Sequence, residues 1–180
     1  MNKTVKRVLI GLVALVALLM GAFWYLSANT KKASPEATAS YTNGVNLSVK
    51  YCKPSKKGRE IFGGLVPYGE VWRTGANEAT VLETDKEITI GGKTLKAGKY
   101  SLWTIPNADN WSVIFNTEVP SWGVSFGGVA SRDAVKDVVQ VTVPVEVMSQ
   151  SAEMLDISFT DTPALVIAWD KTKVSVPIMK

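Results

Sequence analysis

The chain has 180 residues and a formal net charge of +4. The whole excess lies in residues 1–40, which hold five basic residues and one acid, while residues 41–180 hold fifteen of each sign. A domain without net positive charge lacks what a phosphate backbone attracts, so we expect no nucleic-acid binding. The absence of histidine removes the usual proton shuttle and histidine-ligated zinc, and we expect no metal or other cofactor.

The first predicted element is an apolar helix at residues 8–26, preceded by Lys3, Lys6 and Arg7. At about 1.5 Å per residue such a helix spans roughly 28 Å, close to the hydrocarbon thickness of a bilayer. Because basic flanks stay in the cytoplasm, residues 1–7 are predicted to be cytoplasmic. Residues 8–26 then form a single-pass anchor in the inner membrane, and the rest of the chain lies in the periplasm. A signal peptide that is cleaved to release the domain into the periplasm is the alternative.

Residues 27–40 contain no large apolar side chain, and this composition predicts a flexible linker. From residue 41 apolar and polar residues alternate, which indicates strands with one buried face. The predicted strands cover residues 45–52, 78–84, 86–90, 99–105, 111–116, 138–147, 154–159, 164–169 and 173–178.

Two turn signals connect these strands. Gly91-Gly92 predicts a tight hairpin. Leu95, Gly98 and Tyr100 have the spacing of a tyrosine corner. The predicted fold is therefore all-β: an antiparallel two-sheet β-sandwich at residues 41–180, with an N-terminal transmembrane or signal helix. The single cysteine, Cys52, lies in a strand pattern and is expected to be an inert thiol.

Charged and apolar residues are mixed most densely at residues 58–80, GREIFGGLVPYGEVWRTGANEAT. The spacing of Gly64 and Gly69 is that of a phosphate-binding loop, but Glu70 stands where that loop requires lysine, so this interpretation fails. Charges flanked by large apolar residues must pair or bind something. The candidate residues are Arg59, Glu70, Arg73, Asn77 and Glu78.

Three hypotheses fit these residues. They form a connected arginine–carboxylate cluster that holds a long loop, or a polar pocket that binds a small ligand or peptide. In the third hypothesis Glu70 and Glu78 act as the acid and base of a hydrolase. The cluster is expected at one end or face of the domain.

Tryptophan suggests a further possibility, because five indole rings lie in residues 41–180. By alternation Trp111 and Trp169 belong to the core. Trp122, beside Gly123 in a predicted loop, is the candidate for exposure. Exposed tryptophans that stack on sugar rings would make the domain a carbohydrate-binding module.

The motif also resembles the signature of a bacterial envelope family known as domain of unknown function 2911. The resemblance rests on Lys57-Gly58-Arg59, Ile61-Phe62-Gly63, Leu65 to Gly69 and Val71 to Thr80, and it continues through Trp122-Gly123. It covers most of residues 45–180 and implies an exported domain without an assigned activity. The family pattern leads us to expect a tyrosine-rich segment after Gly123, where this chain has VSFGGV.

These observations favour a membrane-anchored periplasmic domain that binds a small ligand, a peptide or an envelope protein. A monomer is expected, and binding is favoured over catalysis. The expected binding residues are Arg59, Glu70, Arg73, Asn77, Glu78 and Trp122. The alternatives are the carbohydrate-binding module and the carboxylate-based hydrolase.

Overall fold

The computed structural model describes residues 2–179, apart from the side chains of residues 26–28. The chain divides into a helical unit that ends at Ala33 and a β-sheet unit that begins at Ser34. All buried and packed apolar residues of the core lie between Ala37 and Ile178. The β-sheet unit therefore contains the whole of its own core, and we expect it to fold without the helix.

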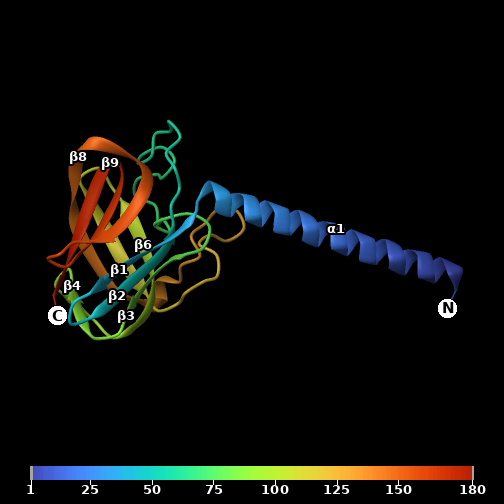
Figure 1. The fold of residues 1–180 in the computed structure, drawn as a ribbon, viewed down its shortest axis with the longest axis horizontal. Helices are drawn as coiled ribbons and strands as arrows, with labels where there is room; N and C mark the ends of the chain where they lie inside the picture. The colour runs from blue at the N-terminus through green and yellow to red at the C-terminus, as the bar shows by residue number, and fades with distance from the viewer. Residues whose placement is uncertain (1, 180) are drawn as a thin grey trace. The chain divides into compact units, whose positions relative to one another are not determined.

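The helical unit is a single helix, α1, at Lys3–Ala33 (Figure 1). It is long and apolar enough to cross a membrane, with a mean hydropathy of 2.4, and a signal sequence has the same character. Lys31 and Lys32 lie in its last turn, where their positive charges interact favourably with the negative end of the helix dipole. Pro35 restricts Ser34, the residue before it, so the helix ends there.

The predicted linker at residues 27–40 differs from the structure. Residues 27–33 continue α1, and β1 at Glu36–Thr42 pairs along its whole length with β2 at Asn46–Cys52. The side chains of β1 alternate between exposed and half-buried positions, and Ala37 and Tyr41 pack against the core. Small side chains are sufficient here because β2 supplies the hydrogen-bonding partners.

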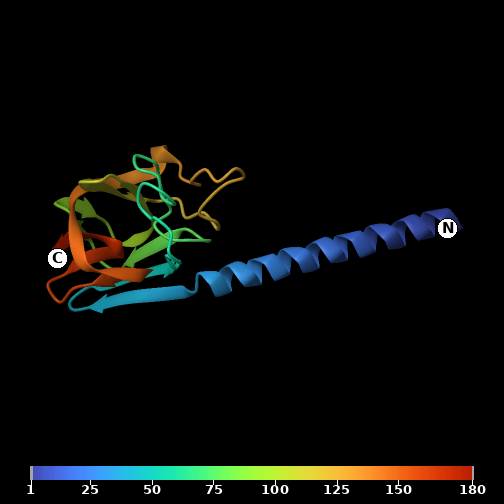
Figure 2. The ribbon, with the colours of Figure 1, turned by 90° about the horizontal axis from the view of Figure 1, so that it is seen from above.

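The β-sheet unit forms an antiparallel sheet, which within residues 2–179 has the strand order β1-β2-β3-β6-β7-β8-β9-β4-β5. It curls so that one face surrounds the apolar core (Figure 2). The prediction of an antiparallel all-β domain is confirmed. The division into two sheets is not, because the strands follow one another in a single open sheet. The remaining strands are β3 Thr80–Thr84, β4 Ile88–Ile90, β5 Lys93–Leu95, β6 Gly98–Pro106, β7 Asn110–Asn116, β8 Asp137–Phe159 and β9 Ala164–Met179.

Two of these strands are longer than predicted. The runs at 138–147 and 154–159 belong to β8, and those at 164–169 and 173–178 belong to β9. The pairing of β8 with β9 shifts register between Val147 and Ala152 and again before Asp156. Such irregularities bend a strand and break the alternation of its side chains, which is why the sequence pattern is interrupted there.

Both predicted turn signals are confirmed. Gly91 and Gly92 have φ values of 56° and 81° and connect β4 to β5, as a two-residue hairpin turn requires. The hydroxyl of Tyr100 donates to the Lys96 carbonyl at 3.0 Å, which is the bond of a tyrosine corner.

The chain that follows β2 contacts the second half of β8. We call this region, residues 51–56 with residues 153–157 and Asp170, the closed side. The Tyr51 hydroxyl donates to the Ile157 carbonyl at 3.2 Å and accepts from the Ile157 amide at 2.9 Å. The Leu155 amide donates to the Pro54 carbonyl at 3.0 Å. These bonds join segments about 100 residues apart in the sequence, and residues 57–79 follow from this point.

Candidate functional site

The segment that carries the candidate residues is fixed to the core by its apolar side chains. Ile61, Phe62 and Val66 are buried, and the Val66 amide donates to the Ile61 carbonyl at 2.8 Å. The ring of Phe62 lies 4.7 Å from Trp111, edge to face. Burial of these large side chains stabilises a segment that forms no regular strand of its own.

Trp72 extends this packing toward the surface. Its ring stacks on Trp169 with centroids 6.0 Å apart and planes 16° apart, and it meets Trp111 edge to face at 6.1 Å. Trp111 and Trp169 are 1% exposed, which confirms that both belong to the core. Trp72 is half-buried, because its other side lines a pocket.

The turn after Trp72 has an unusual backbone. Thr74 and Asn77 have φ values of 55° and 60°, a region that β-branched residues such as threonine rarely adopt. Buried hydrogen bonds hold it: Thr80 Oγ1 donates to the Thr74 carbonyl at 2.9 Å, and the Thr74 and Thr104 hydroxyls are 3.1 Å apart. The side chain of Arg73 is therefore presented by a turn with little freedom to move.

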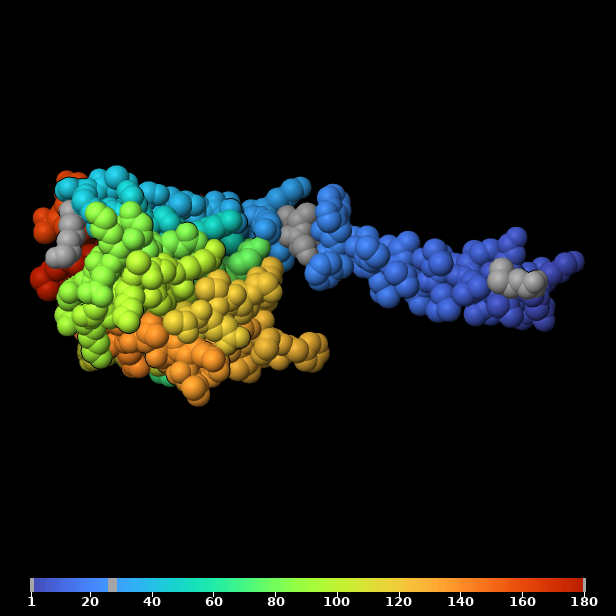
Figure 3. Space-filling model, turned by 90° about the horizontal axis from the view of Figure 1, so that it is seen from below, coloured from blue at the N-terminus to red at the C-terminus, as the bar shows by residue number. Residues whose placement is uncertain are grey.

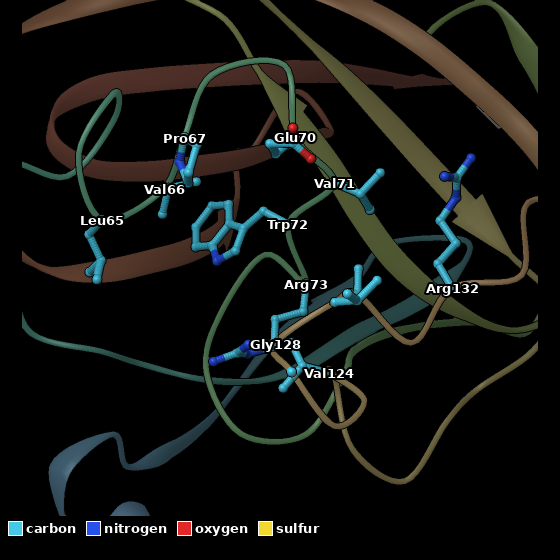
Figure 4. A pocket seen from close by; sticks show the side chains of 13 residues that line it. Leu65, Val66, Pro67, Glu70, Val71, Trp72, Arg73, Val124, Gly128 and Arg132 are labelled. Atoms are coloured by element: carbon cyan, nitrogen blue, oxygen red, sulfur yellow. The ribbon is translucent and has the colours of Figure 1, made fainter.

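A pocket of about 530 Å³ opens beside this turn (Figure 4). One wall comes from residues 65–67 and 70–73, and the other comes from residues 124, 127–130 and 132. Figure 3 shows the second segment, in gold, projecting from the body of the domain. The tip of that segment is apolar and open to water, with Phe126 fully exposed and Val129 67% exposed.

Arg73 lines the pocket below Trp72 and beside Val124 and Gly128 (Figure 4). Its Nε is buried and has no hydrogen-bond partner among residues 2–179, and no carboxylate of the described residues pairs with the guanidinium. Burial lowers the pKa of Arg73, because leaving water disfavours its charge. Gly123 makes room for the side chain, since a Cβ at that position would lie 2.3 Å from the Arg73 Cδ.

A second arginine in the pocket, Arg132, is fully paired. Its Nε donates to Asp137 Oδ1 at 3.0 Å and its Nη2 donates to Oδ2, while Asn116 Nδ2 donates to Oδ1 at 2.8 Å. The Arg132 and Asp137 side chains are 14% and 17% exposed. Sequence reasoning did not single out Arg132, because it lies outside the motif and its pairing was not visible in the pattern.

Glu70 also lines the pocket, above Trp72 in Figure 4 and on the same wall as Arg73. It is exposed, and within the described residues it makes no ion pair or side-chain hydrogen bond. Water solvates this carboxylate, so it carries its charge at little cost.

Arg59 and Glu78 lie elsewhere, which corrects the expectation of one connected cluster. Arg59 is exposed, and its guanidinium donates to the carbonyls of Lys56 and Ser55 at 2.9 and 2.6 Å. Neither residue lines the pocket. The chain turns between Glu70 and Glu78 through the strained Thr74–Asn77 segment, and this turn separates the predicted partners.

Glu78 instead lies beside Cys52, whose Sγ donates to Glu78 Oε2 at 3.4 Å. Burial is the largest cause that raises the pKa of Cys52, followed by the bond to Glu78. The thiol is thus kept protonated, as the inert-thiol prediction requires. Asn77 is buried, and its backbone carbonyl accepts a hydrogen bond from the Gly123 amide at 2.9 Å. This bond positions Gly123, against which the Arg73 side chain packs.

Trp122 is 40% exposed, and it does not line the pocket. Trp103, Trp111 and Trp169 are buried and Trp72 is half-buried, so a sugar-stacking platform in the described domain would rest on Trp122 alone. Among the described residues no group of three or more histidine, cysteine, aspartate or glutamate side chains is placed to hold a metal ion.

The fold and the site define a β-sheet domain with a surface pocket, preceded by a candidate membrane or signal helix. The chain belongs to the family described as "Protein of unknown function (DUF2911)", whose model matches residues 34–178. This match confirms the resemblance seen in the motif, and its start at residue 34 agrees with the start of the β-sheet unit. No curated protein and no solved structure matches the chain.

Proposed function

We propose that the domain is a binding module that takes a small ligand or a short peptide segment in the pocket between residues 65–73 and 124–132. The pocket itself carries the proposal. Its volume of about 530 Å³ is within the range of ligand pockets, roughly 300–1,000 Å³. Its walls combine apolar side chains with a few charged groups, which is the usual composition of such sites.

The exposed apolar side chains around the pocket support this function. Leu65 is 47% exposed and Val129 is 67% exposed, while the interior of the same domain is closely packed. Folding gains nothing from leaving such groups in water. Apolar surface that rims a concavity is typical of a binding site.

We further propose that α1 keeps the domain at the inner membrane, facing the periplasm, as a monomer. Lys3, Lys6 and Arg7 precede the apolar stretch, and this charge pattern supports an N-terminus in the cytoplasm. Release into the periplasm by signal cleavage is the alternative. The N-terminus of the mature protein distinguishes them, because cleavage gives a chain that begins beyond α1.

The hydrolase hypothesis gains no support from the arrangement of the carboxylates. Glu70 lines the pocket, whereas Glu78 lies beside Cys52 and outside the pocket walls. An acid and a base must both reach the same bond. A carbohydrate ligand remains a second candidate only through the exposed Trp122.

The experiment is a fragment screen followed by amide chemical shifts of the labelled domain, residues 34–180. Fragments that bind should shift the amides of residues 65–73 and 124–132. Ala130→Trp, which fills the pocket from its half-buried wall, should abolish these shifts. Val138→Trp, on the exposed face of β8 and outside the pocket, is the matched control and should leave them unchanged. Binding that maps elsewhere, or that survives Ala130→Trp, contradicts the proposal.

A further inference from the structure

The charges that line the pocket differ in how they are compensated. The positive charge of Arg132 is matched by Asp137, and the exposed carboxylate of Glu70 is solvated. Arg73 differs from both: the residue is half-buried, its Nε is buried without a hydrogen-bond partner, and no carboxylate among residues 2–179 pairs with its guanidinium. One positive charge of the pocket therefore has no counter-charge within the domain.

An uncompensated guanidinium that is partly removed from water is costly, and proteins normally pair it. Two features of its surroundings keep the Arg73 side chain in this position. The strained Thr74 backbone fixes the turn, and Gly123 leaves the space that the arginine side chain fills. A guanidinium presents its donors in a planar fork that matches two oxygens of an oxyanion.

We propose that Arg73 is the anion-recognition residue of this pocket, and that the ligand is a carboxylate carried on an apolar body. The inference rests on the proposed function, since it names the ligand class of the same site. The apolar body packs against the walls formed by Trp72, Val71 and Val124. Glu70 lines the same pocket, and its carboxylate repels negative charge, so each further negative charge on the ligand is disfavoured.

Three probes of nearly equal shape test the charge requirement: benzoate, benzamide and benzylamine. Each is titrated into the labelled domain, residues 34–180, and affinity is taken from the amide shifts of the pocket residues. We expect benzoate to bind at least about tenfold more tightly than benzamide, with benzylamine weakest, because a charge-assisted bidentate bond is the strongest contact on offer. Added salt should weaken benzoate and leave benzamide unchanged.

Variants assign this preference to Arg73. R73Q should remove the preference for benzoate over benzamide, and R73K, which keeps the charge but loses the planar fork, should keep part of it. R59Q is the matched control, because it removes the same charge from an exposed arginine outside the pocket, and the preference should remain. E70Q should increase benzoate affinity severalfold, because a nearby negative charge is lost.

The possible failures are distinguishable. If benzamide binds the pocket as tightly as benzoate, or if R73Q keeps the preference, the carboxylate inference is wrong and the pocket proposal stands. If none of the three probes shifts the pocket amides, while the fragment screen maps binding elsewhere, the proposed function is wrong as well. Preferential binding of benzoate that is lost in R73Q and kept in R59Q supports both.

Discussion

The closed side and the pocket both contain basic side chains that are partly removed from water, but only the closed side pairs all of those described here with distant carboxylates. On the closed side Lys53 pairs with Asp156 at 2.9 Å and Lys56 pairs with Asp170 at 2.5 Å. In the pocket Arg73 has no acidic partner among the described residues. The paired charges of the closed side stabilise the fold, whereas the unpaired charge of Arg73 lowers its stability.

Arg132 shows that the pocket is able to compensate an arginine. It lines the same cavity as Arg73, yet its guanidinium bonds both oxygens of Asp137. The absence of an acidic partner is therefore particular to Arg73 and is not a general property of the pocket. We expect substitutions on the closed side and at Arg132 to lower stability, and a substitution at Arg73 to lower binding.

The largest expected loss follows removal of β1. A fragment that begins at residue 43 lacks the strand that pairs with β2 and the contact of Tyr41 with Phe159, whose ring centroids are 6.2 Å apart. We expect its free energy of unfolding in urea to be lower than that of residues 34–180 by at least about 3 kcal/mol. Equal unfolding midpoints would show that residues 36–42 act as the linker predicted from sequence.

Arg132→Met should be the most damaging single substitution of a charged residue in the pocket. The Asp137 carboxylate, 17% exposed, loses its partner, and we expect a loss of about 3 kcal/mol in urea unfolding. The double variant Arg132→Met/Asp137→Leu should recover part of this loss, because no charge is then left unpaired. Failure of the double variant to recover any stability would assign Arg132 a packing role.

Asp170→Asn should have a smaller effect that depends on pH. The bond from Lys56, followed by that from Ser151, lowers the pKa of Asp170, so the stabilisation is present above the ordinary aspartate pKa and is lost as pH falls through the lowered value. Both partners are 24% exposed, and screening by water limits the effect at pH 7 to about 0.5–1 kcal/mol. Asparagine tolerates the φ of 53° at this position, so the backbone should not change. The measurement is urea unfolding at pH 7 and pH 3, and the difference should be smaller at pH 3; a difference that is undiminished at pH 3 would contradict this account.

Arg73→Met should have the smallest effect on stability. No partner in the described domain loses a bond, and a desolvated charge is removed, so the unfolding free energy should change by less than about 0.5 kcal/mol or increase. A loss of about 3 kcal/mol would instead show that Arg73 stabilises the segment at residues 58–80. Arg73 would then be a structural residue, and its role in ligand recognition would lose its support.

The sequence predicts those features that depend on neighbours along the chain. The uncharged stretch at residues 8–26 predicts a membrane or signal helix, and alternation predicts most of the strands. Gly91-Gly92 and Tyr100 predict their turns correctly because the constraint is local. Trp111 and Trp169 are correctly placed in the core because each lies on the apolar face of an alternating run.

Only the tertiary structure decided which groups meet. The weakly apolar residues 36–42 become a strand because β2 is available to pair with them, and no local pattern records that partner. The candidate charges of one short motif take separate partners: Arg59 donates to carbonyls of its own loop, and after the positive-φ turn at Thr74 and Asn77 the chain brings Glu78 to Cys52. Arg73 instead faces a wall made by residues 124–132, about 50 positions further along the chain. Which charged groups pair depends on the distances between them in the folded chain, and those distances follow from the packing of the whole sheet.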